Sequence, residues 1–246
     1  MHDDWIVGKN PVMEALKSER AINKILVLQS LEKKSFDQIN HLAKRQNIFV
    51  QKVPKKKLDQ LGKNHQGVAA SIAAYEYAEL DDLFENAKKN DEAPFFILLD
   101  ELEDPRNLGS IMRSADAVGC HGIIIPKRRS VQLTQTVAKA STGAIEHIPV
   151  VRVTNMSQTI DTLKEKGVWM IGSDASAKQD YREIEYDLPL ALVIGSEGKG
   201  MSRIVTEKCD FLIRLPMRGS VTSLNASVSA SLLMYEVYRY RFPIGD

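Results

Sequence analysis

Two stretches near the end of the chain, LPLALVIGSEGKGM (188–201) and FLIRLPMRGSVTSLNASVSASLLMYEVYRY (211–240), decide the fold. Each contains an apolar run of strand length, Leu190–Ile194 and Phe211–Leu215, that continues into a loop rich in glycine and small polar residues. A long segment of helical periodicity closes the second stretch. Because α/β proteins bind ligands in loops that follow the carboxyl ends of buried strands, we expect the functional site here.

The same pattern extends outward over residues 94–246. Further strands are predicted at Phe95–Leu99, Gly122–Ile125, Ile148–Val153 and Val168–Gly172. Helices are predicted at Asn107–Val118, Thr134–Ser141, Met156–Lys166 and Met201–Lys208. Near-continuous apolar strands that alternate with helices indicate an α/β domain, with a parallel sheet covered on both faces.

Residues 1–75 predict a second, smaller α/β domain. Strands are expected at Ile22–Leu28, Ile48–Val53 and Gly67–Ala74. Helices are expected at 10–18, with a proline in the first turn, after Ser35 as N-cap, and at Lys55–Leu61. Residues 76–93 turn abruptly acidic, and we interpret them as a linker that contains one short helix, Leu80–Lys88.

The composition excludes several classes of protein. Two cysteines among 246 residues are too few for a disulfide framework or a zinc knuckle, so we expect free, buried thiols. The first residues, MHDDWIVGKN, lack the basic and apolar regions of a signal peptide, and no apolar run approaches the ~20 residues of a membrane span. We therefore expect a soluble, cytoplasmic protein.

The net charge of +1 hides an uneven distribution. Residues 1–75 hold 13 Lys or Arg against 7 Asp or Glu, residues 76–104 hold 2 against 11, and residues 105–246 hold 18 against 14. The most basic corner joins Lys55, Lys56 and Lys57 to the turn at His65. Clustered lysines suit an RNA backbone, although a solvated helix face gives the same pattern.

The stretch DPRNLGSIMR (104–113) opens a helix directly after a predicted strand. Asn107 is expected to cap this helix. Arg113 falls off the apolar stripe, where it is free to reach a phosphate or a carboxylate, or to pair with Asp116 on the helix surface. Arg106, in the preceding loop, is a second basic candidate.

The glycine-rich loop GSEGKG (195–200) matches neither common phosphate-binding loop. A Walker A loop needs four residues between its first Gly and the Gly-Lys pair, and this loop has two. Its glycine order also differs from the dinucleotide fingerprint. The loop instead offers bare backbone for a flat ligand, and one carboxylate, Glu197. In the next loop, Ser223 or Asn225 is expected to cap the last helix.

Three stretches, NLGSIMRSADAVG (107–119), LVIGSEGKGM (192–201) and LPMRGSVTSLNASVSASLLMYE (215–236), resemble the three motifs of the SpoU (TrmH-type) RNA ribose methyltransferases of the SPOUT superfamily. The opening VGKNPVMEALKS and the turn HQGVAA resemble the ribosomal-protein-like RNA-binding domain of the RlmB subgroup. That subgroup methylates a guanosine 2′-hydroxyl in 23S ribosomal RNA. The resemblance covers nearly the whole chain.

This resemblance implies S-adenosyl-L-methionine as cofactor, 23S ribosomal RNA as partner, a homodimer with shared sites and a C-terminal trefoil knot. From the residues themselves we expect no metal and no membrane partner. The implied catalytic residues are Asn107, Arg113, Glu197, Ser223 and Asn225. The expected cofactor-binding residues are Gly172, Ser173, Gly195, Leu215 and Leu224. The expected RNA-binding residues are Lys9, Lys55, Lys56, Lys57, His65, Arg106 and Arg218.

The residues agree with such chemistry, because an activated methyl donor needs neither a metal nor a covalent nucleophile and no motif for either is visible. Our hypothesis is that Arg113 deprotonates the ribose hydroxyl or stabilises its developing negative charge. Alternatives are a transfer-RNA ribose methyltransferase of the same fold and a non-catalytic RNA-binding assembly factor. A nicotinamide oxidoreductase is disfavoured by the glycine spacing.

Overall fold

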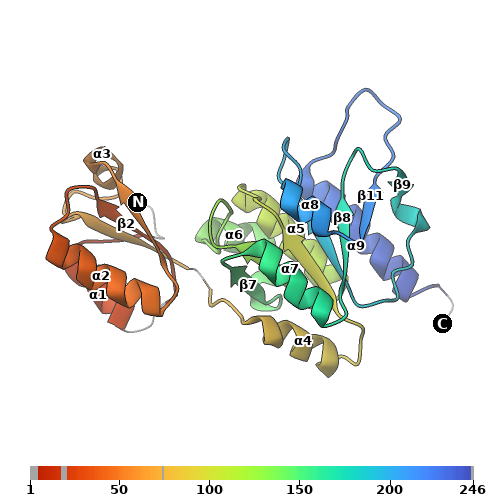
Figure 1. Ribbon diagram of the computed structural model, residues 1–246, viewed down its shortest axis with the longest axis horizontal. Helices are drawn as coiled ribbons and strands as arrows, with labels where there is room; N and C mark the ends of the chain where they lie inside the picture. Colours follow the sequence, from red (N-terminus) through yellow and green to blue (C-terminus); the bar gives the residue numbers. More distant parts are fainter. Residues whose placement is uncertain (1–4, 18–20, 74, 245–246) are drawn as a thin grey trace. The chain divides into compact units, whose positions relative to one another are not determined.

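The computed structural model describes residues 5–17, 21–73 and 75–244 (Figure 1). The chain forms two compact units, one of residues 1–76 with 132–135 and one of residues 77–131 with 136–246. Ser18 and Ala74, at the ends of a predicted helix and a predicted strand, lie outside the described residues. Each unit has its own sheet and its own core.

The first unit has a four-stranded sheet in the order β1-β4-β2-β3. β2 and β3 are parallel, and β4 runs antiparallel to β1 and β2. Apolar residues of α1 and α2 pack on one face of the sheet, and the short α3 packs on the other. The elements are β1 (Trp5–Val7), α1 (Lys9–Lys17), β2 (Ile22–Leu28), α2 (Lys33–Arg45), β3 (Phe49–Val53), α3 (Lys55–Asp59) and β4 (Val68–Ile72).

The prediction that Ser35 caps the second helix is wrong. Helix α2 begins at Lys33, with Glu32 in the N-cap position. Ser35 lies in the first turn and is buried, where its hydroxyl accepts a hydrogen bond of 2.8 Å from Lys9 Nζ. A polar side chain next to an apolar pattern can cap a helix or be buried with a partner, and local sequence does not separate the two.

The second unit has a seven-stranded sheet in the order β7-β6-β5-β10-β8-β11-β9, and every neighbouring pair is parallel. This confirms the predicted α/β class. The central strands β5 and β10 are buried along their whole length. The strands are β5 (Phe95–Leu99), β6 (Gly122–Pro126), β7 (Val150–Val153), β8 (Trp169–Ser173), β9 (Gln179–Asp180), β10 (Leu190–Ile194) and β11 (Phe211–Arg214).

Helices cover both faces of this sheet (Figure 1). Leu83 of α4, Ile160 of α7 and Val205 of α8 share one core with alternate residues of β5 and β10. Helices α5 and α9 pack against each other, and Ser114 and Ser231 hydrogen-bond across their contact at 2.7 Å. The helices are α4 (Leu80–Lys89), α5 (Pro105–Ala117), α6 (Gln135–Ser141), α7 (Met156–Glu165), α8 (Arg203–Lys208) and α9 (Ala226–Arg241), with 3₁₀ turns at Ala144–Glu146 and Tyr181–Glu183.

The start of α5 corrects a second capping prediction. Asp104 is the N-cap, and its carboxylate accepts a 2.8 Å hydrogen bond from the backbone N–H of Arg106. Pro105 fills the first helical position, where no N–H is needed. Asn107 therefore lies inside the first turn, and its side chain is free for a different contact.

Two further expectations concern cysteines and membranes. Neither Cys120 nor Cys209 forms a disulfide; Cys120 is buried and Cys209 half-buried. Burial raises the pKa of both thiols to about 12.

No helix within residues 5–17, 21–73 and 75–244 is long and apolar enough to cross a membrane. The trefoil knot stays a prediction.

Candidate active site

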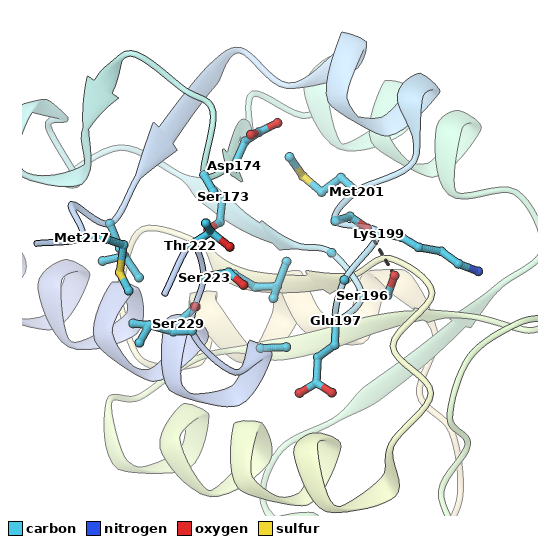
Figure 2. Close-up of a pocket in the computed structure, with 18 residues that line it drawn as sticks. Ser173, Asp174, Ser196, Glu197, Lys199, Met201, Met217, Thr222, Ser223 and Ser229 are labelled. Carbon is cyan, nitrogen blue, oxygen red and sulfur yellow. Dashed lines mark hydrogen bonds between the residues drawn. The ribbon is translucent and has the colours of Figure 1, made fainter. Parts of the chain in front are cut away.

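A cavity of about 370 Å³ lies at the carboxyl ends of β8, β10 and β11 (Figure 2). Its walls come from residues 173–175 after β8, residues 194–201 after β10, and the loop and first turn that follow β11. Parallel neighbours place these three loops at one edge of the sheet. Four of the predicted cofactor-binding residues line this one cavity: Ser173, Gly195, Leu215 and Leu224.

The glycine-rich loop after β10 folds back on itself. Ser196 and Gly200 exchange two backbone hydrogen bonds, of 3.0 and 2.9 Å. A Cβ on Gly195 would lie 2.1 Å from the carbonyl carbon of Gly200 and 2.2 Å from the nitrogen of Met201, so no larger residue fits this turn. The loop therefore presents main-chain atoms to the cavity.

Gly172, the fifth predicted cofactor position, lies beside the cavity and not in its wall. A Cβ there would lie 2.7 Å from Cys209 Sγ and 2.8 Å from Met201 Cε. The missing side chain thus lets the segment after β10 approach β8 closely. Ser173, the next residue, reaches the cavity.

Asn107, Glu197 and Asn225 form a hydrogen-bonded cluster at the cavity. Asn107 Nδ2 donates to Glu197 Oε1 at 2.8 Å. Asn225 Nδ2 donates to Asn107 Oδ1 at 3.1 Å and also to the same Glu197 oxygen. Figure 2 shows the Glu197 carboxylate pointing down from its loop toward the yellow-green helix α5, which carries Asn107. We call these three residues the amide–carboxylate cluster; they join three segments that are far apart in the chain.

Asn225 and Asn107 each have a structural role besides their contact with Glu197. Asn225 is the N-cap of α9, and its Oδ1 accepts from the backbone N–H groups of Ser227 and Val228 at 2.9 and 3.3 Å. This resolves the choice between Ser223 and Asn225 as cap. Asn107 is 6% exposed. Because an unpaired buried amide is costly, Asn107 fixes the Glu197 carboxylate against α5.

Sequence reasoning did not identify Asp100, a buried carboxylate directly after β5. Its Oδ2 accepts a 2.6 Å hydrogen bond from the backbone N–H of Ser202, the N-cap of α8. Its own N–H donates to the carbonyl of Ile194 at 2.8 Å. Asp100 thereby anchors both ends of the glycine-rich loop, and its place at a strand's carboxyl end was the available signal.

Other wall residues were also not predicted. Asp174 follows β8 directly, and Met201 ends the glycine-rich loop. Met217, Thr222 and Ser229 come from the segment after β11. Figure 2 shows Asp174, Met217 and Met201 around the rim of the cavity. Such residues give no pattern of their own, so only the position of each loop pointed to them.

The structure does not bring the predicted arginines into the cavity wall. Arg113 is exposed on α5 and lies six residues after Asn107, about 9 Å further along the helix axis. Arg106 is exposed at the start of the same helix. Arg218 is exposed in the loop after β11, next to Met217 of the cavity wall.

The predicted RNA-binding residues of the first unit differ in exposure. Lys55, Lys56 and Lys57 are exposed on α3, and Lys9 is half-buried and bonded to Ser35. His65 is 6% exposed: its Nδ1 accepts from the N–H of Gly67 at 2.9 Å and its Nε2 lies 3.0 Å from Asp59. Both ring nitrogens of His65 therefore support the turn before β4.

Comparison with known families decides the identity. Residues 94–235, which carry the cavity and the amide–carboxylate cluster, match the model of the SpoU rRNA Methylase family. The chain belongs to this family. Residues 5–78 match the model for RNA 2′-O ribose methyltransferase substrate binding, so the first unit is that of an RNA 2′-O-methyltransferase of the SpoU/TrmH type.

Relatives of this SpoU methylase match over the whole chain. The TrmH-family tRNA/rRNA methyltransferase YacO of Bacillus subtilis is 63% identical and covers 99% of this chain and 98% of its own length. A TrmH-family tRNA/rRNA methyltransferase of Staphylococcus haemolyticus is 57% identical over 100% of this chain and 99% of its own.

Solved structures of SpoU methylases share the fold. AviRb from Streptomyces viridochromogenes, in complex with AdoMet, is 26% identical with a TM-score of 0.62, covering 96% of this chain and 90% of that one. The AdoMet-bound rRNA methyltransferase from Sinorhizobium meliloti is 25% identical with a TM-score of 0.61, covering 96% and 87%.

The cofactor of this SpoU methylase is S-adenosylmethionine. The cavity fits it, because three glycines of the loop after β10, Gly195, Gly198 and Gly200, line the cavity and leave main-chain atoms open to a ligand. When bound, the cofactor supplies a methyl group activated by a sulfonium. In the part of the chain that the structure describes, no group of three or more His, Cys, Asp or Glu residues is placed to hold a metal ion.

Proposed function

We propose that this RNA methyltransferase methylates the 2′-hydroxyl of a guanosine in 23S ribosomal RNA, in the cytoplasm. The observation that supports this most strongly is the amide–carboxylate cluster, in which Asn107, Glu197 and Asn225 meet beside the cofactor cavity. A site assembled from three distant segments fixes the position of a substrate oxygen, and position supplies much of the rate when the methyl donor is already activated.

We name ribosomal RNA as the first candidate substrate because of how much of the chain each solved structure covers. The rRNA methyltransferase of Sinorhizobium meliloti covers 96% of this chain, including the first unit. The TrmH/SpoU tRNA modifying enzyme of A. aeolicus, 25% identical with a TM-score of 0.55, covers 65% of it. Transfer RNA remains the second candidate, because the relatives in Bacillus and Staphylococcus are named tRNA/rRNA methyltransferases.

In our proposal, the residues of the cavity and of the RNA-binding surface have different roles. Glu197 receives both amide donors on one oxygen, so the cluster keeps the glycine-rich loop closed over the donor. Ser223 lines the cavity in an exposed loop, where its hydroxyl can orient the ribose. Lys55, Lys56, Lys57 and Arg218 are exposed and would hold the RNA backbone.

We further propose a homodimer that shares its sites. Helix α9 exposes an apolar face in which Val228 is 46%, Leu232 48% and Tyr235 52% exposed. Residues at spacings of three, four and seven lie on one side of a helix, so these side chains form a continuous strip. A second copy of the chain would bury this strip.

A dimer through α9 also gives Arg113 a role. Helix α5 packs beside α9, so Arg113 on its exposed side would lie near the dimer contact and within reach of the partner's cavity. An arginine is a poor base because its guanidinium stays protonated at neutral pH. We therefore assign Arg113 to stabilising the negative charge that develops on the ribose oxygen.

The test is methyl transfer in vitro from radiolabelled S-adenosylmethionine to unmodified 23S ribosomal RNA and to unmodified transfer RNA, with the product mapped by ribose-methylation sequencing. We expect a single guanosine of 23S RNA to be labelled. Arg113→Ala should retain cofactor affinity and lose at least 100-fold in turnover, about 2.7 kcal/mol. Labelling of transfer RNA alone would transfer the proposal to the second candidate.

A further inference from the structure

A second cavity of the larger unit shares no lining residue with the cofactor cavity. It encloses about 490 Å³ at the carboxyl ends of β6 and β7, beside the first turns of α7. Two cations line it, Lys127 and Arg152, together with polar side chains that include Asn155, Gln158 and Thr159. We call it the β6–β7 pocket.

The sheet places the two cations side by side. β6 and β7 are parallel neighbours, with Ile125 paired to Arg152. Lys127 directly follows β6, and its backbone N–H donates to the carbonyl of Val153 at 2.8 Å. The two positive side chains therefore come from adjacent strand ends, and their relative position is set by the ladder.

The two cations have different surroundings. The Arg152 guanidinium lies 3.9 Å from the centre of the Tyr77 ring, which orients it. Burial lowers the pKa of Lys127, as does the charge of Arg152, while Glu79 acts in the opposite direction. Within the described residues, the Lys127 ammonium makes no hydrogen bond or ion pair. Two half-buried like charges in a cavity favour an anion between them.

The amino end of α7 adds to the positive potential. The helix begins at Met156, and the Asn155 side chain caps it by accepting from the N–H of Gln158 at 3.1 Å. The first turn of a helix carries a partial positive charge. This contribution is secondary to Lys127 and Arg152, which supply whole charges.

We propose that the β6–β7 pocket binds a phosphate group of the substrate RNA backbone, as an anchor separate from the methylation site. The inference rests on RNA being the substrate. The pocket and the cofactor cavity open at the same edge of one sheet, three strands apart in the order β7-β6-β5-β10. At ~4.8 Å per strand, that is about 14 Å, a distance that a single-stranded segment of a few nucleotides spans.

The test measures RNA affinity against salt with Lys127→Gln and the double variant Lys127→Gln/Arg152→Gln. The probe is a fluorescent single-stranded oligouridylate, which carries phosphates but no 23S sequence. We expect each variant to bind at least 3-fold more weakly at low salt. The slope of log affinity against log salt should become shallower by about 0.7, because one phosphate of the RNA is no longer neutralised.

Lys89→Gln is the matched control, because it removes the same charge from an exposed position at the end of α4 in the same unit. Cofactor affinity and thermal melting, measured for every variant, report on folding, and Lys127→Gln spares the Arg152 contact with Tyr77. Methyl transfer to 23S RNA is assayed separately, so failure of the proposed activity and failure of the proposed anchor are distinguishable.

Unchanged RNA affinity and salt slope in both Lys127→Gln and the double variant would overturn the proposal, as would an equally weakened affinity in Lys89→Gln. A titration with inorganic phosphate separates a second possibility. Phosphate binding that Lys127→Gln abolishes, with RNA affinity unchanged, would reassign the pocket to a free anion and equally overturn the RNA anchor.

Discussion

At the scale of single residues, the site depends on glycines as much as on residues with side chains. Gly195 lets the loop after β10 close on itself, and Gly172 lets β8 approach that loop. The cluster of Asn107, Glu197 and Asn225 then fixes the closed loop to two helices. Bare backbone therefore faces the cavity, and side chains hold that backbone in place.

We predict that Gly195→Ala lowers affinity for S-adenosylmethionine by at least 10-fold. Its Cβ would lie 2.1 Å from a backbone carbon of Gly200, and backbone cannot move aside as a flexible side chain can. Isothermal titration calorimetry gives the affinity. Gly219→Ala is the control, because its Cβ would meet nothing within 4 Å. Equal affinities for the two variants would contradict the role of this turn.

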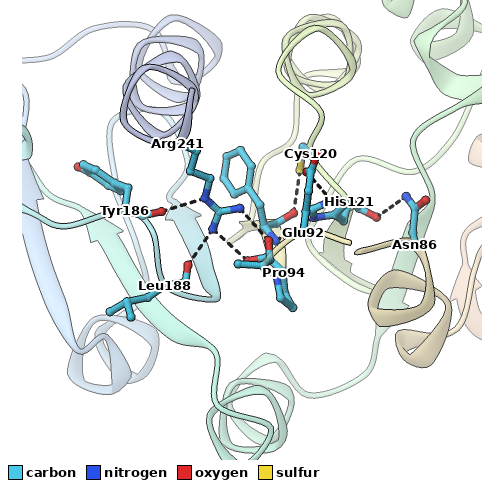
Figure 3. A network of polar contacts seen from close by, with 10 residues as sticks. Asn86, Glu92, Pro94, Cys120, His121, Tyr186, Leu188 and Arg241 are labelled. Carbon is cyan, nitrogen blue, oxygen red and sulfur yellow. Dashed lines mark hydrogen bonds and ion pairs between the residues drawn. The ribbon is translucent and has the colours of Figure 1, made fainter. Parts of the chain in front are cut away.

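We predict that the stability of the folded protein depends on pH through His121, which lies in a network of polar contacts (Figure 3). Its buried ring accepts from the N–H of Phe95 at 3.0 Å, and its Nε2 lies 3.2 Å from Glu92. Burial lowers the pKa of His121, and the charge of Arg241 lowers it further, against the influence of Glu92. The unfolded chain then binds a proton more readily than the folded one, so stability is lost as pH falls below about 6.5.

The measurement is the melting temperature between about pH 5 and pH 8. We expect the wild type to melt at lower temperature on the acid side, and His121→Asn, which keeps an acceptor for Phe95, to show a smaller decline. His147→Asn, at an exposed position, serves as control and should behave as the wild type. The same acid decline in all three proteins would remove His121 from this explanation.

At the residue scale the sequence indicated the glycine-bearing loops after β10 and β11. Four of the five predicted cofactor-binding residues line the cavity. Their contacts with the cofactor stay predictions. It did not indicate Asp100, because a lone carboxylate after a strand has no spacing signal. It also placed Asn107 at the cap, since the pattern does not distinguish the cap from the first turn. The catalytic role of Arg113 stays a prediction.

At the scale of elements, Arg241 connects the end of α9 to the amino ends of β5 and β10 (Figure 3). Its Nε donates to the carbonyl of Tyr186 at 2.9 Å, and its two terminal nitrogens donate to Ala93 and Leu188, each at 2.7 Å. The guanidinium also lies 5.4 Å from the centre of the Phe95 ring. One planar fork thus ties α9 to two backbone segments, 93–94 and 186–188.

We predict that Arg241→Lys destabilises the protein by about 2 kcal/mol, because an ammonium lacks the fork and leaves carbonyl groups unpaired. Urea denaturation followed by circular dichroism measures the change. Arg203→Lys is the control: Arg203 is exposed and pairs with Glu207 on its own helix, so its change should stay within about 0.5 kcal/mol. Equal destabilisation in the two variants would count against the clamp.

The elements themselves were largely predictable. Apolar β-branched runs give strands wherever they are buried on both faces, as at Leu190–Ile194, which matches β10 residue for residue. The two-residue β9 was not predicted, because its pairing depends on β11 and not on its own sequence. The position of β10 between β5 and β8 likewise depends on contacts between residues far apart in the chain.

At the scale of the whole molecule, the exposed strip on α9 sets the expected assembly. We predict that Tyr235→Glu yields a monomer that keeps cofactor affinity within about 3-fold and loses methyl transfer, because a charge cannot be buried unpaired in an apolar contact. Sedimentation velocity gives the mass.

The control for this change is Ile204→Glu, which places the same charge at a side chain that is 58% exposed on α8, a helix that shares its core with α4 and α7. This variant should remain a dimer. A wild type that sediments as a monomer at all concentrations, or a dimer that Tyr235→Glu leaves intact, would reject the strip as the contact.

For the whole chain, the order of the motifs said more about function than the amino-acid composition did. The net charge of +1 suggested no partner, whereas three motifs in sequence indicated the family that the comparison confirmed. Motifs are local, so they cannot report strand order or assembly. Those depend on contacts between distant segments and between chains.

The cluster at the cavity has a consequence for biosynthesis. Asn225 begins the last helix, so it is synthesised after every strand of the seven-stranded sheet, and Arg241 follows it. The sheet can therefore emerge from the ribosome while the third member of the cluster is still to be added. We expect the nascent chain to acquire its cofactor site only when α9 emerges, and products terminated before Asn225 to bind no donor.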